Sequence, residues 1–216
     1  MTAASMFPGV YLYWIPLGAG AHLVRANGKL FEAVSALVQR RRPCDLYHSA
    51  LEVIDHDGRF IVEMTPIPDS DGAQRGVVAE GPVGARWIGR FRLFRYEIRR
   101  WRGGAIPDAD EALSGPVRVG NAAHASQLLD LVPLLPTPVW GRDELNAGEM
   151  WNSNSVTSWL LARSGIDSAD IRPPLGGRAP GWNAGLVTAW RQLAGVDGSI
   201  DSSPVYVRRS ERCVTL

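Results

Sequence analysis

The pattern of hydrophobic and polar residues predicts a strand-rich first half. Residues 10–17 are almost wholly apolar and rich in β-formers, which is typical of a buried strand. Residues 45–54 and 59–66 predict two more strands. The Asp57-Gly58 pair between them favours a tight hairpin.

A fourth strand is predicted over residues 85–102, where arginines interleave with aromatic residues. The alternation changes phase near residues 93–94, which a β-bulge or a bend would reconcile. The seven arginines of this stretch have two interpretations. They either contact a phosphate backbone between aromatic side chains or form the charged solvent face of an edge strand.

Helices are predicted mainly in the second half, from apolar residues at i, i+3 and i+4 spacing and from a stop glycine at Gly165. The predicted helices cover residues 29–41, 124–135, 152–164 and 183–193. Residues 67–84 and 172–182 are predicted loops. A short strand is expected at 204–207. This mixture indicates an α+β fold, an antiparallel sheet packed against helices. We expect a single domain over residues 1–216, with its core at about 8–190 and a tail at 195–216.

Composition agrees with a folded domain of ordinary size. The chain has 216 residues, of which 45% are hydrophobic and 21% charged. Its only lysine is Lys29, so 22 of the 23 basic residues are arginine, yet 22 acidic residues leave a net charge of +1. This balance gives no electrostatic footprint for nucleic acid, and we expect no such partner.

Several other classes of site are not expected. Cys44 and Cys213 match no zinc or redox spacing, and two free thiols are favoured over a single disulfide. Dispersed histidines and the lack of a phosphate-cradling glycine motif predict neither metal nor cofactor. No apolar run is long enough for an integral membrane segment. Residues 6–17 lack a preceding basic residue, so they predict a strand rather than a leader, and a cytoplasmic protein.

The candidate chemistry begins with His48, the only histidine in the middle of an apolar strand. A two-residue turn puts Glu63 on the same face as His48: a turn at His56-Asp57 places it opposite Ala50, diagonal to His48, and a turn at Asp57-Gly58 places it one pair further away. A three-residue loop would put His48 and Glu63 on opposite faces. A neighbouring carboxylate can orient a histidine ring. The alternative is a structural role for His48, since a lone histidine in a strand is more often a structural residue than a catalytic one.

The predicted helix over 152–164 supplies a second candidate. Ser153 or Asn154 is a natural N-cap, which puts Ser155 in the first turn, where unpaired backbone N–H groups converge. A nucleophile and an oxyanion hole can be built there, with His48 as the base. The alternative is that serine and asparagine are present only because they cap helices.

Two segments together carry a resemblance. "YHSALEV" on an early strand and "NSNSVTSWLL" at the start of a late helix resemble the circularly permuted papain-like superfamily, which includes deSUMOylating peptidases and the lecithin–retinol acyltransferase type. The wider segment over residues 151–166, with residues 172–182 after it, also resembles a bacterial branch of this superfamily that has serine in place of the catalytic cysteine. The resemblance puts His48 at the histidine position, Ser155 at the cysteine position and Glu63 at the polar position.

The resemblance implies one of two functions. The first is a hydrolase or acyltransferase that acts on an amide, ester or thioester through a Ser155–His48 dyad, with Glu63 or water orienting the ring. A serine hydroxyl is a poorer nucleophile than a thiol, so the second is a catalytically inactive binding or structural module that uses the same cleft.

A substrate pocket is predicted beside the dyad. Four residues near Ser155 would bind a peptide, lipid or other acyl-containing substrate, because such pockets are mostly apolar with a few polar groups. They are Asn154, Trp151, Arg178 and Trp182. The alternative is that the tryptophans belong to the core.

Overall fold

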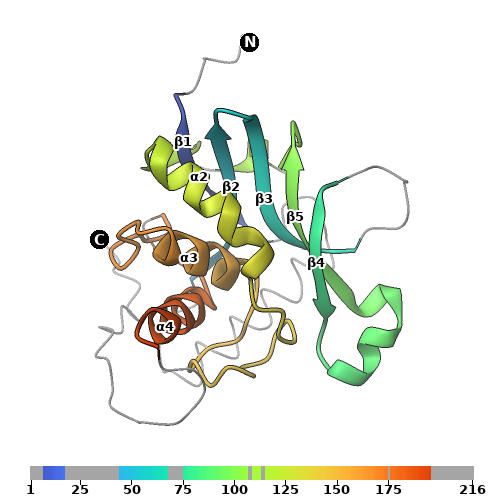
Figure 1. Ribbon diagram of the computed structural model, residues 1–216. Helices are drawn as coiled ribbons and strands as arrows, with labels where there is room; N and C mark the ends of the chain where they lie inside the picture. Colours follow the sequence, from blue (N-terminus) through green and yellow to red (C-terminus); the bar gives the residue numbers. More distant parts are fainter. Residues whose placement is uncertain are drawn as a thin grey trace.

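An antiparallel sheet runs through the centre of the protein, and helices cover one of its faces (Figure 1). The computed structural model describes residues 7–17, 44–67, 75–106, 109–112, 115–174 and 176–195. The predicted α+β class is therefore confirmed. The predicted helix over 29–41, the tail from 196 onward with the strand at 204–207, and Cys213 lie outside the described residues.

The sheet has the strand order β4-β5-β3-β2-β1-β6, and β7 pairs with β2 beside this path. All pairs except β2–β7 are antiparallel. The strands are β1 (Gly9–Pro16), β2 (Asp45–Asp55), β3 (Gly58–Pro66), β4 (Val77–Pro82), β5 (Arg95–Arg102), β6 (Val117–Gly120) and β7 (Gly177–Arg178).

The hairpin between β2 and β3 turns at His56-Asp57, since Asp55 pairs with Gly58. Gly58 opens β3 with φ of 125°, a conformation that favours glycine, which explains the Asp-Gly signal in the sequence. The same register pairs Leu51 with Val62, so Glu63 lies one residue beyond the last pair.

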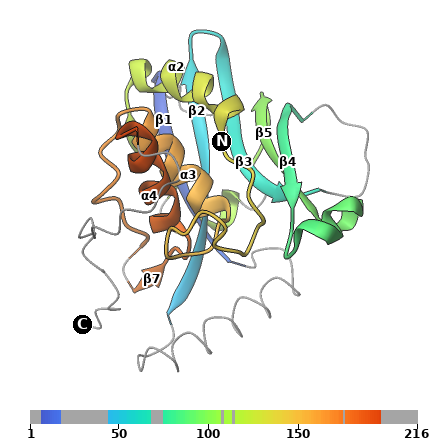
Figure 2. The same ribbon diagram turned by 60° about the horizontal axis from the view of Figure 1, so that its bottom comes forward.

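The helices on the sheet are α2 (Ala122–Leu131), α3 (Ser153–Arg163) and α4 (Trp182–Leu193). They confirm three predicted helices to within a few residues, and the 3₁₀ helix η4 (Val132–Leu134) continues α2. Helices α3 and α4 lie side by side, and α3 packs against β2 (Figure 2). Their N-terminal turns meet, because the Ser155 hydroxyl donates to the carbonyl of Gly181.

The pleat gives the sheet two different faces. Leu12, Trp14, Leu51 and Val53 belong to the large core shared with the three helices. A small second cluster lies on the opposite face, formed by Ile15, Ala50, Ile61 and Ile106.

Two predictions of local structure are wrong. The predicted loop over 67–84 contains β4, whose Gly81 lies where an added Cβ would be 2.3 Å from the Tyr96 ring. The predicted strand over 85–102 is a strand only from Arg95, and residues 86–94 form two 3₁₀ helices, η1 (Arg86–Arg90) and η2 (Arg92–Phe94). Because β4 pairs with β5, β5 is an interior strand and not the predicted edge.

Cys44 is disulfide-bonded, so the expectation of a free thiol at this position is wrong. Spacing along the chain cannot settle this point, because a disulfide depends on which segments the fold brings together. In the described part of the chain, every helix is too short or too polar to cross a bilayer.

We predict that Gly185→Ala destabilises the protein. Its Cβ would lie 2.1 Å from both the Ser155 carbonyl oxygen and the Ser158 hydroxyl, so α3 and α4 would have to separate. The free energy of unfolding, measured by urea titration, should fall by about 1–3 kcal/mol even though alanine favours helix. Leu193→Ala, at the exposed end of the same helix, should change it by less than about 0.5 kcal/mol. A neutral Gly185→Ala would contradict this close packing.

Candidate functional site

The first turn of α3 is closed by a capping box. Asn152 is the N-cap, and its Oδ1 accepts from the backbone N–H groups of Asn154 (2.9 Å) and Ser155 (3.3 Å). The Ser155 hydroxyl oxygen accepts from the Asn152 N–H at 3.1 Å. The cap therefore lies one residue before Ser153 and two before Asn154, the two predicted caps, and Ser155 occupies the third helical position.

The Ser155 side chain is fully buried. Its hydroxyl donates to the carbonyl oxygen of Gly181 at 2.7 Å, with the carbonyl of Met150 at 3.3 Å. The single hydroxyl proton is thus directed to backbone oxygens, and the oxygen accepts a backbone N–H. A substrate has no access to this hydroxyl in the structure.

Asn154 connects α3 to β2 and to the start of α4. Its Oδ1 accepts from the Ser49 hydroxyl at 2.9 Å, and its Nδ2 donates to the carbonyls of Tyr47 (3.0 Å) and Pro180 (2.9 Å). Asn154 is 2% exposed. The predicted contact between this helix and the histidine strand therefore exists, but a buried amide makes it. We call Asn152, Asn154 and Ser155 the capping cluster.

His48 lies on the opposite face of the sheet from Ser155. Its neighbours Tyr47 and Ser49 are directed to the helices, as the Ser49–Asn154 bond and the place of Tyr47 in the large core show. His48 pairs instead with Ile15, which belongs to the second cluster. Successive strand residues alternate between faces, so the predicted Ser155–His48 dyad does not form.

Glu63 is engaged by an arginine. It pairs with Arg99 across β3 and β5, and its carboxylate accepts from Arg99 Nη1 at 3.0 Å. Arg99 also forms an ion pair with Glu97, which in turn contacts Arg75. Burial raises the pKa of Glu63, although Arg99 acts in the opposite direction. The predicted face of Glu63 is correct, and its role of orienting His48 stays a prediction.

A second buried polar group lies on this same face. The carboxylate of Glu52 accepts from the Tyr13 hydroxyl at 2.5 Å and forms an ion pair with Arg59. Burial, with the bond to Glu52, raises the pKa of Tyr13. Neither group of ion pairs was predicted, although the period-2 spacing of Glu97 and Arg99 along the sequence puts these two residues on one face of a strand.

The predicted substrate-binding tryptophans belong to the core. Trp151 is 1% exposed, and Trp182 packs on Trp14 with ring centroids 5.0 Å apart. Their Nε1–H groups are buried and find no acceptor among the described residues. Both side chains therefore supply packing area to the large core.

Arg178 lies in β7, the short strand that pairs with residues 45–46 of β2. Close by, Glu149 caps α4 by accepting from the Gly181 N–H at 2.8 Å. Burial raises the pKa of Glu149, while its backbone bonds and Arg178 act to lower it. Arg178 thus contributes to the charge balance at the start of α4, and its predicted role as a substrate contact stays a prediction.

One group of potential metal ligands was not anticipated. Asp55, His56 and Asp57, at the β2–β3 turn, have ligand atoms within 4.8 Å of one another. The ring nitrogens of His56 face the two carboxylates, at 2.8 Å and 3.5 Å. The bond to Asp55 raises the pKa of His56. These contacts within the turn account for the arrangement without an ion.

Comparison of the chain with family models, with curated proteins and with solved structures gives no match in any of the three. The function is therefore inferred from the residues themselves.

We predict that Ser155→Ala lowers the free energy of unfolding by about 1–3 kcal/mol, because the N–H of the N-cap Asn152 loses its acceptor and the carbonyl of Gly181 loses its buried donor. Thermal or urea unfolding measures the change. Ser126→Ala, which removes a half-buried hydroxyl bonded to Asp55, is the matched control and should cost less. A stability unchanged by Ser155→Ala would contradict the structural role.

A second prediction concerns Arg99. Arg99→Met leaves the buried Glu63 without its cation and should cost about 3–5 kcal/mol near neutral pH. Because burial raises the Glu63 pKa, the folded state binds its proton more readily than the unfolded state. The stability of the variant should therefore fall as pH rises through that pKa.

Urea unfolding at about pH 5 and about pH 8 measures this dependence, and the loss should be larger at the higher pH. The double variant Glu63→Gln/Arg99→Met should recover much of the loss, because no charge then stays buried at position 63. A loss that is the same at both pH values and in both variants would contradict the ion-pair assignment.

Proposed function

We propose that the protein is a catalytically inactive binding or structural module on a scaffold of the permuted papain-like type. One observation carries the proposal: the Ser155 hydroxyl is fully buried and donates to the Gly181 carbonyl, while His48 lies on the other face of the sheet. The hydrolase that the sequence suggested would need both groups in one accessible place.

The electrostatics of the first turn favour the same proposal. A serine nucleophile needs a general base within hydrogen-bond reach and unpaired N–H groups for an oxyanion. Here the Asn152 side chain occupies the N–H groups of Asn154 and Ser155. The polar atoms that would form an active site are used to join α3, α4 and β2.

The resemblance to permuted papain-like proteins is part of the proposal, with a changed role for its residues. What supports it is the packing of the first turn of α3 against the strand of His48, through Asn154. In this scheme, a helix start that holds a nucleophile in the superfamily holds a structural cap here.

The compartment belongs to the same proposal. The sequence favoured the cytoplasm, whereas a disulfide is typical of oxidising compartments. The disulfide at Cys44 is therefore a reason to prefer an oxidising compartment.

We expect no labelling of the folded protein by a fluorophosphonate probe, because the Ser155 hydroxyl is inaccessible and lacks a base. Intact-mass measurement of the wild type checks this, with a known serine hydrolase as the positive control. Ser155→Cys should likewise stay unmodified by iodoacetamide while folded and become modified in urea. Labelling of the wild type that is lost in both Ser155→Ala and His48→Ala would establish the dyad and overturn the proposal.

A further inference from the structure

The segment over residues 86–94 projects from the sheet between β4 and β5. It consists of η1 and η2, and neither of these 3₁₀ helices buries a residue. Figure 1 shows the segment extending beyond the end of β4 at the lower right, away from the three helices. We call residues 86–94 the projection.

The projection is the largest gathering of exposed apolar side chains in the described chain. Trp87 is 69% exposed, Phe91 49%, Leu93 78% and Phe94 40%. The other exposed large apolar residues are single and far apart in sequence, such as Leu134 and Leu193. Four large apolar residues exposed within eight positions of the chain are typical of an interaction site, whereas single ones are ordinary.

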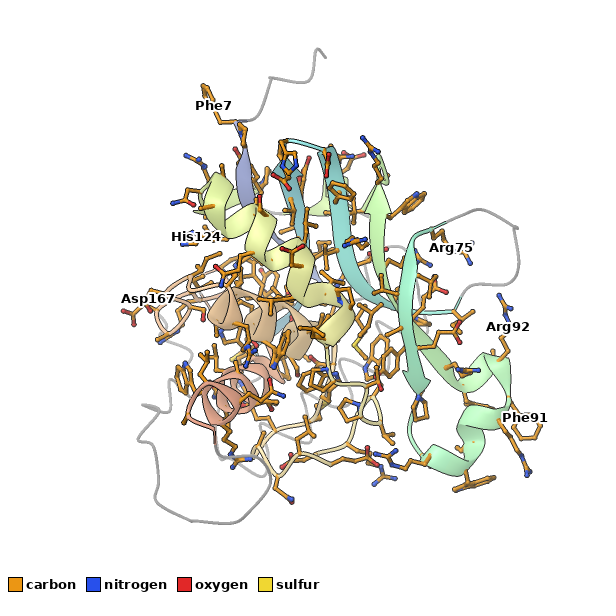
Figure 3. The ribbon with its side chains drawn as sticks, viewed as in Figure 1. Phe7, Arg75, Phe91, Arg92, His124 and Asp167 are labelled. Atoms are coloured by element: carbon orange, nitrogen blue, oxygen red, sulfur yellow. The ribbon has the colours of Figure 1, made fainter. Side chains whose placement is uncertain are left out.

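The arginines at the base of the projection differ from those at its tip. The base is formed by Arg86 and by Arg95, the first residue of β5, and the tip is residues 87–93. At the base, Arg86 forms an ion pair with Glu144 at 2.7 Å, and Arg95 pairs with Glu80 at 2.9 Å. At the tip, Arg90 and Arg92 are exposed and have no ion pair within the described residues. Phe91 and Arg92 point outward at the right edge of the molecule (Figure 3).

The base is also held by backbone bonds. The Val83 N–H donates to the carbonyl of Phe94 at 2.8 Å, and the Gly84 N–H donates to that of Trp140 at 3.0 Å. The guanidinium of Arg90 lies 4.7 Å from the centroid of the Phe91 ring. The tip therefore combines apolar side chains with unpaired cations on a base that is already ordered, which lowers the entropy cost of docking.

We propose that the projection docks on an anionic lipid bilayer. Tryptophan, phenylalanine and leucine insert at the boundary between headgroups and acyl chains, and arginines beside them attract anionic headgroups. Both requirements are met within nine residues. This peripheral attachment needs no membrane-spanning helix, and it does not depend on whether Ser155 is catalytic.

Charge favours this partner over two others. A symmetric contact between two copies through the tip would bring the unpaired Arg90 and Arg92 of both copies together, which is repulsive. A nucleic acid would pair with the arginines but leave Leu93 exposed. An anionic bilayer accommodates both the arginines and the apolar side chains.

Cosedimentation of the full chain with vesicles tests the proposal. One set contains phosphatidylcholine and phosphatidylglycerol in equal parts, and the other contains phosphatidylcholine alone. We expect binding to the anionic vesicles and much weaker binding to the neutral ones. Arg90→Gln/Arg92→Gln should lower the partition coefficient on anionic vesicles roughly thirtyfold, and Trp87→Ala/Leu93→Asn about tenfold or more.

Matched controls place the same changes elsewhere on the surface. Leu134→Asn removes a leucine that is 65% exposed, and Arg102→Gln removes an arginine from the far end of β5. Both should bind as the wild type does. Circular dichroism shows whether each variant is folded, and because the four tip side chains are exposed, we expect all of them to fold.

Three results would overturn the proposal. Absence of binding to anionic vesicles by the folded wild type is the first, and equal binding by the tip variants and the controls is the second. The third is binding to single-stranded nucleic acid that is stronger than vesicle binding and unaffected by Trp87→Ala/Leu93→Asn, which would assign the arginines to phosphate contacts instead.

Discussion

The hydrogen bonds of the capping cluster hold the two halves of the protein together. Asn154 joins β2 from the first half to α3, and Asn154 and Ser155 both reach the start of α4 through Pro180 and Gly181. Buried polar groups of this kind are stabilising only when each finds its partner, so the three segments can pack in only one arrangement. The close approach of α3 and α4 at Gly185 depends on the same arrangement.

The sheet separates two kinds of interior. Its helix-covered face combines the large apolar core with the buried hydrogen bonds of the capping cluster, while its other face carries the ion pairs of Glu52, Glu63 and Arg99. A residue's parity along its strand therefore decides its environment. His48 and Ser49 differ by one position, yet Ser49 belongs to the capping cluster's contacts and His48 to the opposite face.

Much of the fold could be predicted from the sequence, because β1, β2, β3 and the helices have strong periodicity and clear end signals. The projection could not, since its arginine–aromatic alternation imitates a strand, and β4 was hidden in a stretch rich in glycine and proline. The predicted Ser155–His48 site is wrong for a different reason. Whether His48 faces Ser155 depends on which side of β2 the helices cover. Because β2 has apolar residues on both sides, such as Ala50 and Leu51, its sequence did not distinguish the two.

The order of the strands has a consequence for folding. β1 is synthesised before the other described strands but pairs with β6, which is synthesised much later. Likewise, the Tyr47 carbonyl and the Ser49 hydroxyl of β2 have no Asn154 to bond with until α3 has been made. The hydrogen bond from Ser155 to Gly181 can form only later, once Gly181 has been synthesised. Contacts between such distant segments slow folding, so an early β1–β2–β3 meander should form on the ribosome and stay incomplete until α4 has left the exit tunnel.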